Sequence, residues 1–158
     1  MGRRGRGLAW AACGVGVLYA AVSVYWGLGG MWLLDTVGGS LARLGRARSD
    51  AVLAAAWGAG ALKLIAALLP LAAVRGRGGR AVWVLAWLAA GILILYGAVL
   101  SGVGWLVQAG VIHASATADH RALAWHAYLW DPWFLGWGLL IAGALVRARA
   151  PRRARAIP

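Results

Sequence analysis

The sequence predicts an all-α protein: a bundle of four transmembrane helices, with the N- and C-termini both cytoplasmic. Of its 158 residues, 63% are hydrophobic and only 13% are charged. A water-soluble domain usually carries about a quarter charged residues. The apolar residues form four long runs, and the basic residues gather between and outside them. This arrangement is typical of a multi-pass protein of a bacterial plasma membrane.

The four expected spans cover residues 8–34, 51–74, 81–106 and 122–146. Each supplies the roughly 20 residues that a helix needs to cross the hydrocarbon core. The basic segment 1–7 precedes the first span, which is far longer than the core of about 7–15 residues in a signal peptide, so we expect it to be retained. The basic, proline-containing segment 147–158 is expected to be disordered and associated with lipid.

The first connection, between residues 34 and 51, carries three Arg with Leu41 and Leu44 between or beside them. This pattern favours a short amphipathic turn along the headgroups.

The distribution of Arg predicts the orientation. With a cytoplasmic N-terminus, the inner side holds eleven of the 15 Arg and the outer side holds four. An excess of basic residues marks the cytoplasmic side. The net charge of +12 is also compatible with nucleic acid. No basic face interleaves with base-reading residues, however, so we expect membrane lipids as partners and no nucleic acid.

Lys63 is the most informative residue of the second span. It lies 13 residues after Asp50 and 12 before Arg75, near the middle of the membrane. A lysine at that depth costs about 2.5–3.5 kcal/mol on insertion scales, so it is predicted to face the bundle interior and to have a partner. Asp131 is the candidate partner. Lys63 is then either functional, as a counter-charge for a ligand or a proton-handling group, or structural, in an ion pair or in bonds to exposed carbonyls.

The fourth span contains the sequence Trp130-Asp131-Pro132-Trp133. Proline has no N–H and disfavours helix at the preceding residue. The span is therefore either broken at membrane depth, with Asp131 capping a shorter helix, or simply enters its helix there. His126 lies five residues before Asp131, a spacing that is poor for one face of an α-helix.

Polar and aromatic residues concentrate in the outer half. The 11 Trp follow the same skew, which indicates either an aromatic belt or an outward-opening cavity. The candidate ligand-binding residues are Lys63, Asp131, Tyr25, Trp26, Trp130, Trp133, Gln108, His126 and Asp35. The three His are scattered and have no Cys or Glu beside them, so no metal site is predicted, and no motif indicates a cofactor.

Small residues recur at a spacing of four in two spans. Gly97 and Ser101 form one such pair, and Ala54 and Gly58 form another. This spacing lets helix backbones approach closely, although it is frequent by chance in a chain rich in Ala and Gly.

The segment from Tyr25 to Gly30, Tyr-Trp-Gly-Leu-Gly-Gly, resembles the Tyr-Trp-Ala-x-Gly-Gly signature of the bacterial family called domain of unknown function 3995. The segment from Leu129 to Leu135, with Pro132, is similar to the Leu-Tyr-Ser-Pro-Leu segment that opens the last helix of that family. Ser23 and Val24 stand where the family often has a His. The resemblance implies a four-helix membrane protein and no established activity.

The leading functional hypothesis is a bundle that binds a lipid-like or small hydrophobic molecule in an outward-facing pocket of aromatic and polar side chains. One alternative is a small intramembrane isomerase or cyclase with Asp131 as its acid. Another is a structural or accessory subunit that packs against a membrane-protein partner or a second copy of itself.

Overall fold

The computed structural model describes residues 3–115 and 117–153, and over these residues the protein is all-α, without any strand. The elements in chain order are α1 (Arg3–Gly27), the 3-10 turn η1 (Leu34–Thr36), α2 (Gly39–Ala47), α3 (Asp50–Val74), α4 (Gly79–Gln108), α5 (His120–Trp125), the π-helical turn η2 (His126–Trp130) and α6 (Asp131–Arg153). The predicted all-α class is confirmed.

In the described part of the chain, four stretches of helix are long and apolar enough to cross a membrane: Gly5–Gly27, Asp50–Val74, Gly79–Gln108 and His120–Ala148. They agree in number with the sequence prediction and suggest a membrane protein. The C-terminal ends of the first and last helices differ from the expectation. Helix α1 stops at Gly27, well before residue 34, while α6 remains helical through residues 147–153 of the tail that was expected to be disordered. Residues 154–158 lie outside the described part.

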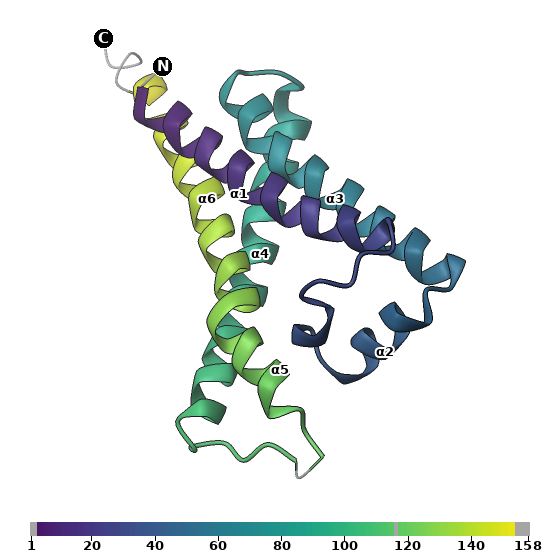
Figure 1. The fold of residues 1–158 in the computed structure, drawn as a ribbon. Coiled ribbons are helices and arrows are strands. Elements are labelled where there is room, and N and C mark those ends of the chain that lie inside the picture. Colours follow the sequence, from purple (N-terminus) through teal and green to yellow (C-terminus); the bar gives the residue numbers. More distant parts are fainter. Residues whose placement is uncertain (1–2, 116, 154–158) are drawn as a thin grey trace.

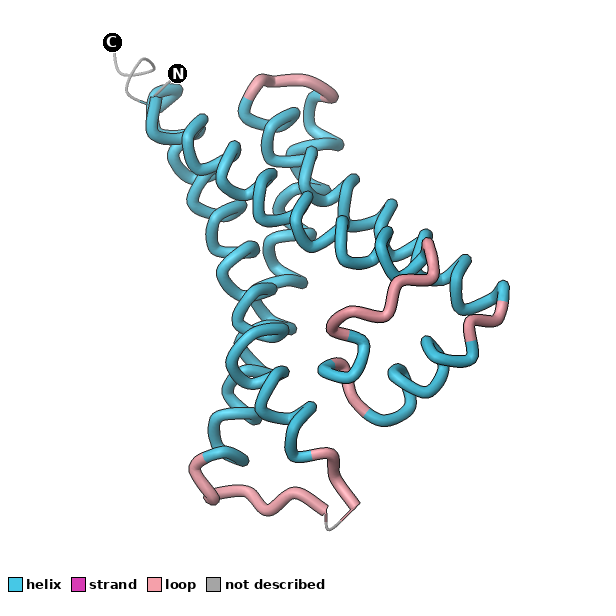
Figure 2. Tube along the Cα trace, in the orientation of Figure 1, coloured by secondary structure: helices cyan, strands magenta, loops and turns pink. Residues whose placement is uncertain are grey.

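The four long helices form two antiparallel pairs. Helix α1 packs against α3, α4 packs against α6, and the pairs meet where α1 crosses α6 (Figure 1). The two termini and the α3–α4 connection lie at one end, which we call the terminal end. Towards the other end, the distal end, the pairs diverge, and the chain from residue 28 to 49 folds beside the opening (Figure 2). The bundle therefore has the shape of a V.

Helices α4 and α6 meet backbone to backbone at glycines. A Cβ placed on Gly138 would lie 2.8 Å from the backbone nitrogen of Ile94, and one on Gly97 would overlap the backbone of Leu135. Ser101, one turn after Gly97, is fully buried. The pair Gly97 and Ser101 thus lies at a helix interface, as its spacing predicts. We call this contact the α4–α6 seam.

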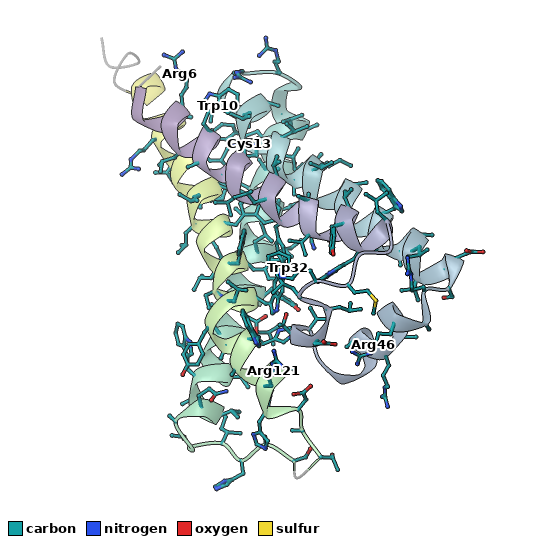
Figure 3. All side chains as sticks on the ribbon, in the orientation of Figure 1. Arg6, Trp10, Cys13, Trp32, Arg46 and Arg121 are labelled. Atoms are coloured by element: carbon teal, nitrogen blue, oxygen red, sulfur yellow. The ribbon has the colours of Figure 1, made fainter. Side chains whose placement is uncertain are left out.

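The short helix α2 occupies the first connection, where the Leu and Arg pattern predicts an amphipathic turn. Its Arg46 forms an ion pair with Asp35, and both side chains are exposed. Figure 3 places Arg46 and Arg121 at the distal end and Arg6 at the terminal end, so charged side chains lie at both ends of the spans.

Candidate functional site

Lys63 lies on the face of α3 that packs against α1. Its Nζ donates a hydrogen bond to Ser23 Oγ at 2.7 Å and lies 4.0 Å from the centre of the Tyr19 ring. Tyr19 and Ser23 are one turn apart on α1, and both are buried. We call Tyr19, Ser23 and Lys63 the Lys63 cluster. Both groups that contact the ammonium are neutral. Ser23 accepts the hydrogen bond through a lone pair of its hydroxyl, and Tyr19 presents the face of its ring.

Lys63 and Asp131 have different partners in the structure. Among the described residues, the ion pairs join Asp35 to Arg46 and Asp131 to His126. The pairing considered from the sequence is therefore not formed. The physical reason is that each charge has a nearer partner: Lys63 reaches Ser23 and Tyr19 of α1, whereas the π-helical turn holds Asp131 against His126.

An aromatic wall connects the Lys63 cluster to α6. The Tyr19 ring lies 5.7 Å from Trp130, 5.5 Å from Trp133 and 4.8 Å from Phe134, measured between ring centres. Trp26 continues the wall at 6.0 Å from Trp130. The indole N–H groups of the three Trp donate to acceptors within the protein. The ammonium of Lys63 has three N–H donors and, among the described residues, a single hydrogen-bonded partner, so it keeps donor capacity for a ligand.

Asp131 and His126 come together through the π-helical turn. Asp131 is 3% exposed, and its Oδ1 lies 3.2 Å from His126 Nδ1. The other ring nitrogen, Nε2, lies 3.3 Å from the backbone oxygen of Val37. The spacing of five predicted that the two side chains would lie on different faces of an α-helix. That expectation is wrong because η2 closes an i to i−5 hydrogen bond, from Asp131 N–H to His126 O, and so places the two residues one turn apart.

The π-helical turn lacks one backbone donor because of Pro132, and a side chain of α4 replaces that donor. In a π-helical turn the oxygen of Ala127 would accept from residue 132, but proline has no N–H. Trp105 Nε1 of α4 donates to this oxygen instead, at 2.8 Å. Neighbouring helices often satisfy the backbone groups that proline frees inside a membrane. The fourth span therefore continues through Asp131–Pro132 as helix.

Tyr25 and Trp26 end helix α1. Gly30 N–H bonds to Tyr25 O and Gly29 N–H to Trp26 O, both at 2.9 Å, which is the pattern of a Schellman motif. Gly29 has φ +84°, a conformation that favours glycine. Trp26 Nε1 also donates to Trp32 O at 2.9 Å. The Tyr-Trp-x-x-Gly-Gly segment is thus a helix stop that folds the chain back, and it explains why α1 ends before residue 34.

Two further candidates lie apart from the aromatic wall. Asp35 is exposed and paired with Arg46, and Gln108 is exposed at the last turn of α4. Three residues of the site were not predicted from the sequence: Tyr19, Ser23 and Thr36. The first two carry a signal, since they are polar residues one turn apart on an apolar helix. In the described part of the chain, no three His, Cys, Asp or Glu side chains gather as a metal-ligand set.

A shallow apolar groove of about 520 Å³ runs along the contact of α1 and α6. Its walls include Val15 of α1 and Trp133, Trp137 and Leu140 of α6. Trp133 therefore links the groove to the Lys63 cluster, because it lines the groove and contacts the ring of Tyr19.

The comparisons with known proteins agree with the two sequence motifs. A family model described as "Protein of unknown function (DUF3995)" matches residues 16–141, which confirms the resemblance suggested by the Tyr25–Gly30 segment. No curated protein and no solved structure matches the chain. The match includes the Lys63 cluster, the helix stop at Gly29 and the π-helical turn.

Proposed function

The chain belongs to this family of proteins of unknown function, and on that premise we propose that it is a multi-pass protein of the bacterial plasma membrane that binds an anionic, lipid-like molecule at the Lys63 cluster. One observation carries the proposal. A lysine near the middle of a span has a hydroxyl and an aromatic ring as partners, and among the described residues it has no carboxylate partner.

The energetics favour a ligand that brings a negative charge. A lysine at this depth costs about 2.5–3.5 kcal/mol, and neutral partners offset only part of that cost. Hydrogen bonds to charged groups contribute about 1.5–3 kcal/mol each, so an anion at Nζ would stabilise the cluster strongly. The apolar groove and the wall of Tyr19, Trp130 and Trp133 suit the hydrocarbon part of an amphipathic molecule.

Binding can be measured by energy transfer from the tryptophans to a pyrene-labelled fatty acid in phosphatidylcholine vesicles that contain the protein. We expect the acid to bind and its uncharged methyl ester to bind about tenfold or more weakly, because only the acid offers an anion to Lys63. Pyrene-labelled phosphatidic acid forms a second arm that distinguishes a phosphate headgroup from a carboxylate. Equal binding of acid and ester would contradict the proposal.

The matched variants are Lys63→Leu, Lys63→Arg and Gln108→Leu. Lys63→Leu should lose the preference for the acid, Lys63→Arg should retain much of it, and Gln108→Leu should bind like wild type because Gln108 lies apart from the aromatic wall. A thermal melt of each variant in detergent checks the fold. A Lys63→Leu variant that melts at the wild-type temperature and still prefers the acid would exclude Lys63 as the counter-charge.

The proposed orientation places both termini in the cytoplasm, supported by the eleven Arg on that side against four on the other. The Lys63 cluster then faces the outer half. Alkaline phosphatase fused after the C-terminus should be inactive, and green fluorescent protein at the same position should fluoresce. The reverse result would invert the orientation and leave the binding proposal unaffected.

A further inference from the structure

The loop of residues 28–38 is fastened to η2 at two points. Trp130 Nε1 donates to Thr36 Oγ1 at 3.0 Å, and Thr36 Oγ1 in turn donates to Leu33 O at 2.6 Å. The second point is the contact of His126 Nε2 with Val37 O at 3.3 Å. Trp130 also stacks on Tyr19 of the Lys63 cluster, with an interplanar angle of 20°. The loop is therefore attached to the residues that form the aromatic wall.

The His126 contacts imply a definite number of protons. Val37 O is a carbonyl and can only accept, so Nε2 must carry a proton to bond with it. A second proton must lie between Nδ1 and Asp131 Oδ1, because a carboxylate facing an imidazole lone pair would be repulsive. Either an imidazolium faces a carboxylate, or a neutral ring faces a carboxylic acid. In both forms the His126–Asp131 pair holds one proton more than a neutral His beside a carboxylate.

Loss of that proton removes one of the two contacts. A neutral His126 has a single N–H, which can point to Asp131 or to Val37 but not to both. The bond to the buried carboxylate is the stronger one, since hydrogen bonds to ionised acceptors are roughly twice as strong as those to neutral acceptors. Nε2 then carries a lone pair that faces Val37 O, so this hydrogen bond is lost and the loop loses its second attachment.

The titratable and charged groups that face the His126–Asp131 pair come from several elements. Tyr19 of α1 and Tyr96 of α4 are the phenols that interact electrostatically with Asp131. From α3, Lys63 faces Tyr19. On the loop itself, the group that faces His126 is the backbone oxygen of Val37, since Asp35 is engaged with Arg46. His126 and Asp131 are thus the two groups that share a proton at this position.

We propose that His126 and Asp131 form a proton-binding site inside the fourth span, and that the bound proton fastens the 28–38 loop to η2. At low pH the loop is held at both points, and as pH rises the loss of the shared proton releases it at the His126–Val37 contact, while the Trp130–Thr36 bond remains. That the released loop changes access to the Lys63 cluster rests on the proposed function. The fastening of the loop does not, and it can be tested without any ligand.

Spin labels report the loop directly. Met31 in the loop and Tyr128 in η2 are exposed, at 47% and 66%, and can be replaced by labelled cysteines in a Cys13→Ala background. Distances are then measured by double electron–electron resonance in nanodiscs at about pH 5 and about pH 9, on either side of the usual range for His. For the otherwise native chain we expect a narrow distance distribution at the lower pH and a broader or longer one at the higher pH.

Two variants distinguish the effect of the shared proton from the effect of the contact between His126 and Val37. In Asp131→Asn the side-chain amide donates to Nδ1, so neutral His126 keeps its Nε2 proton for Val37, and the distribution should stay narrow at both pH values. In His126→Phe both contacts are lost, and the distribution should be broad at both. A native distribution that does not change with pH, or an Asp131→Asn protein that responds like the native one, would overturn the proposal. Lys63→Leu should keep the full pH response, so failure of the ligand proposal would be recognised separately.

Discussion

The α4–α6 seam and the Lys63 cluster are held together by opposite means. At the seam, glycines such as Gly97 and Gly138 bring the backbones of α4 and α6 into contact. At the cluster, Lys63 bridges α1 and α3 through a hydroxyl and an aromatic ring. Water is absent from the hydrocarbon core, so close packing is the main force at the seam. The comparison teaches that backbone packing holds the α4–α6 half of the V together, while the α1–α3 half carries a charge that packing alone does not explain.

The largest expected effect comes from breaking the seam. In Gly97→Leu the new Cβ would overlap the backbone of Leu135 and press on the backbone oxygen of Asp131 at 2.9 Å. Backbone atoms cannot move aside as a flexible side chain can, so we expect a loss of stability on the order of 3 kcal/mol or more. The measurement is a thermal melt followed by size-exclusion chromatography in mild detergent. A Gly97→Leu protein with the native melting temperature would show that the seam is looser than the structure indicates.

The sequence could predict the four spans because continuous hydrophobicity is a local property that the membrane itself demands. It also located Lys63 near the middle of a span by counting alone. It could not distinguish Gly97 and Ser101 from Ala54 and Gly58, because the same spacing becomes an interface only where a partner helix is present. Gly58 has open space around the position of its Cβ, whereas Gly97 meets α6.

The pairing of His126 with Asp131 was beyond sequence reasoning for a different reason. An α-helical period separates residues five apart, and the π-helical turn that reunites them depends on a tertiary contact, the bond from Trp105 to Ala127 O. Pro132 shows that a backbone acceptor must lose its usual donor, but it does not show which helix supplies the replacement. Likewise, the partners of Lys63 on α1 depend on how α1 packs against α3, and the sequence does not show that packing.

An intermediate effect is expected where the seam supports the proton-binding pair. Trp105→Phe keeps the ring but removes the N–H that satisfies Ala127 O, so a buried acceptor loses its partner. We expect a destabilisation of about 1 kcal/mol, since hydrogen bonds inside membranes contribute about that much or less. Equilibrium unfolding in detergent measures it. The control is Trp10→Phe, because Trp10 is 58% exposed and its indole nitrogen makes no hydrogen bond within the described residues. Equal effects of the two variants would mean that the bond contributes nothing specific.

The smallest effect should come from Gly58→Leu, which sharpens the comparison by matching Gly97→Leu in chemistry. Gly58 is exposed on α3, and nothing lies within 4 Å of the position of its Cβ. A leucine there replaces one apolar surface by another that faces lipid, and it also improves helix propensity over glycine. We expect a change within about 0.5 kcal/mol of wild type. If Gly58→Leu instead lowers the melting temperature as Gly97→Leu does, then the outer face of α3 is covered by another helix in the membrane. The second small-residue pair would then mark an interface between chains.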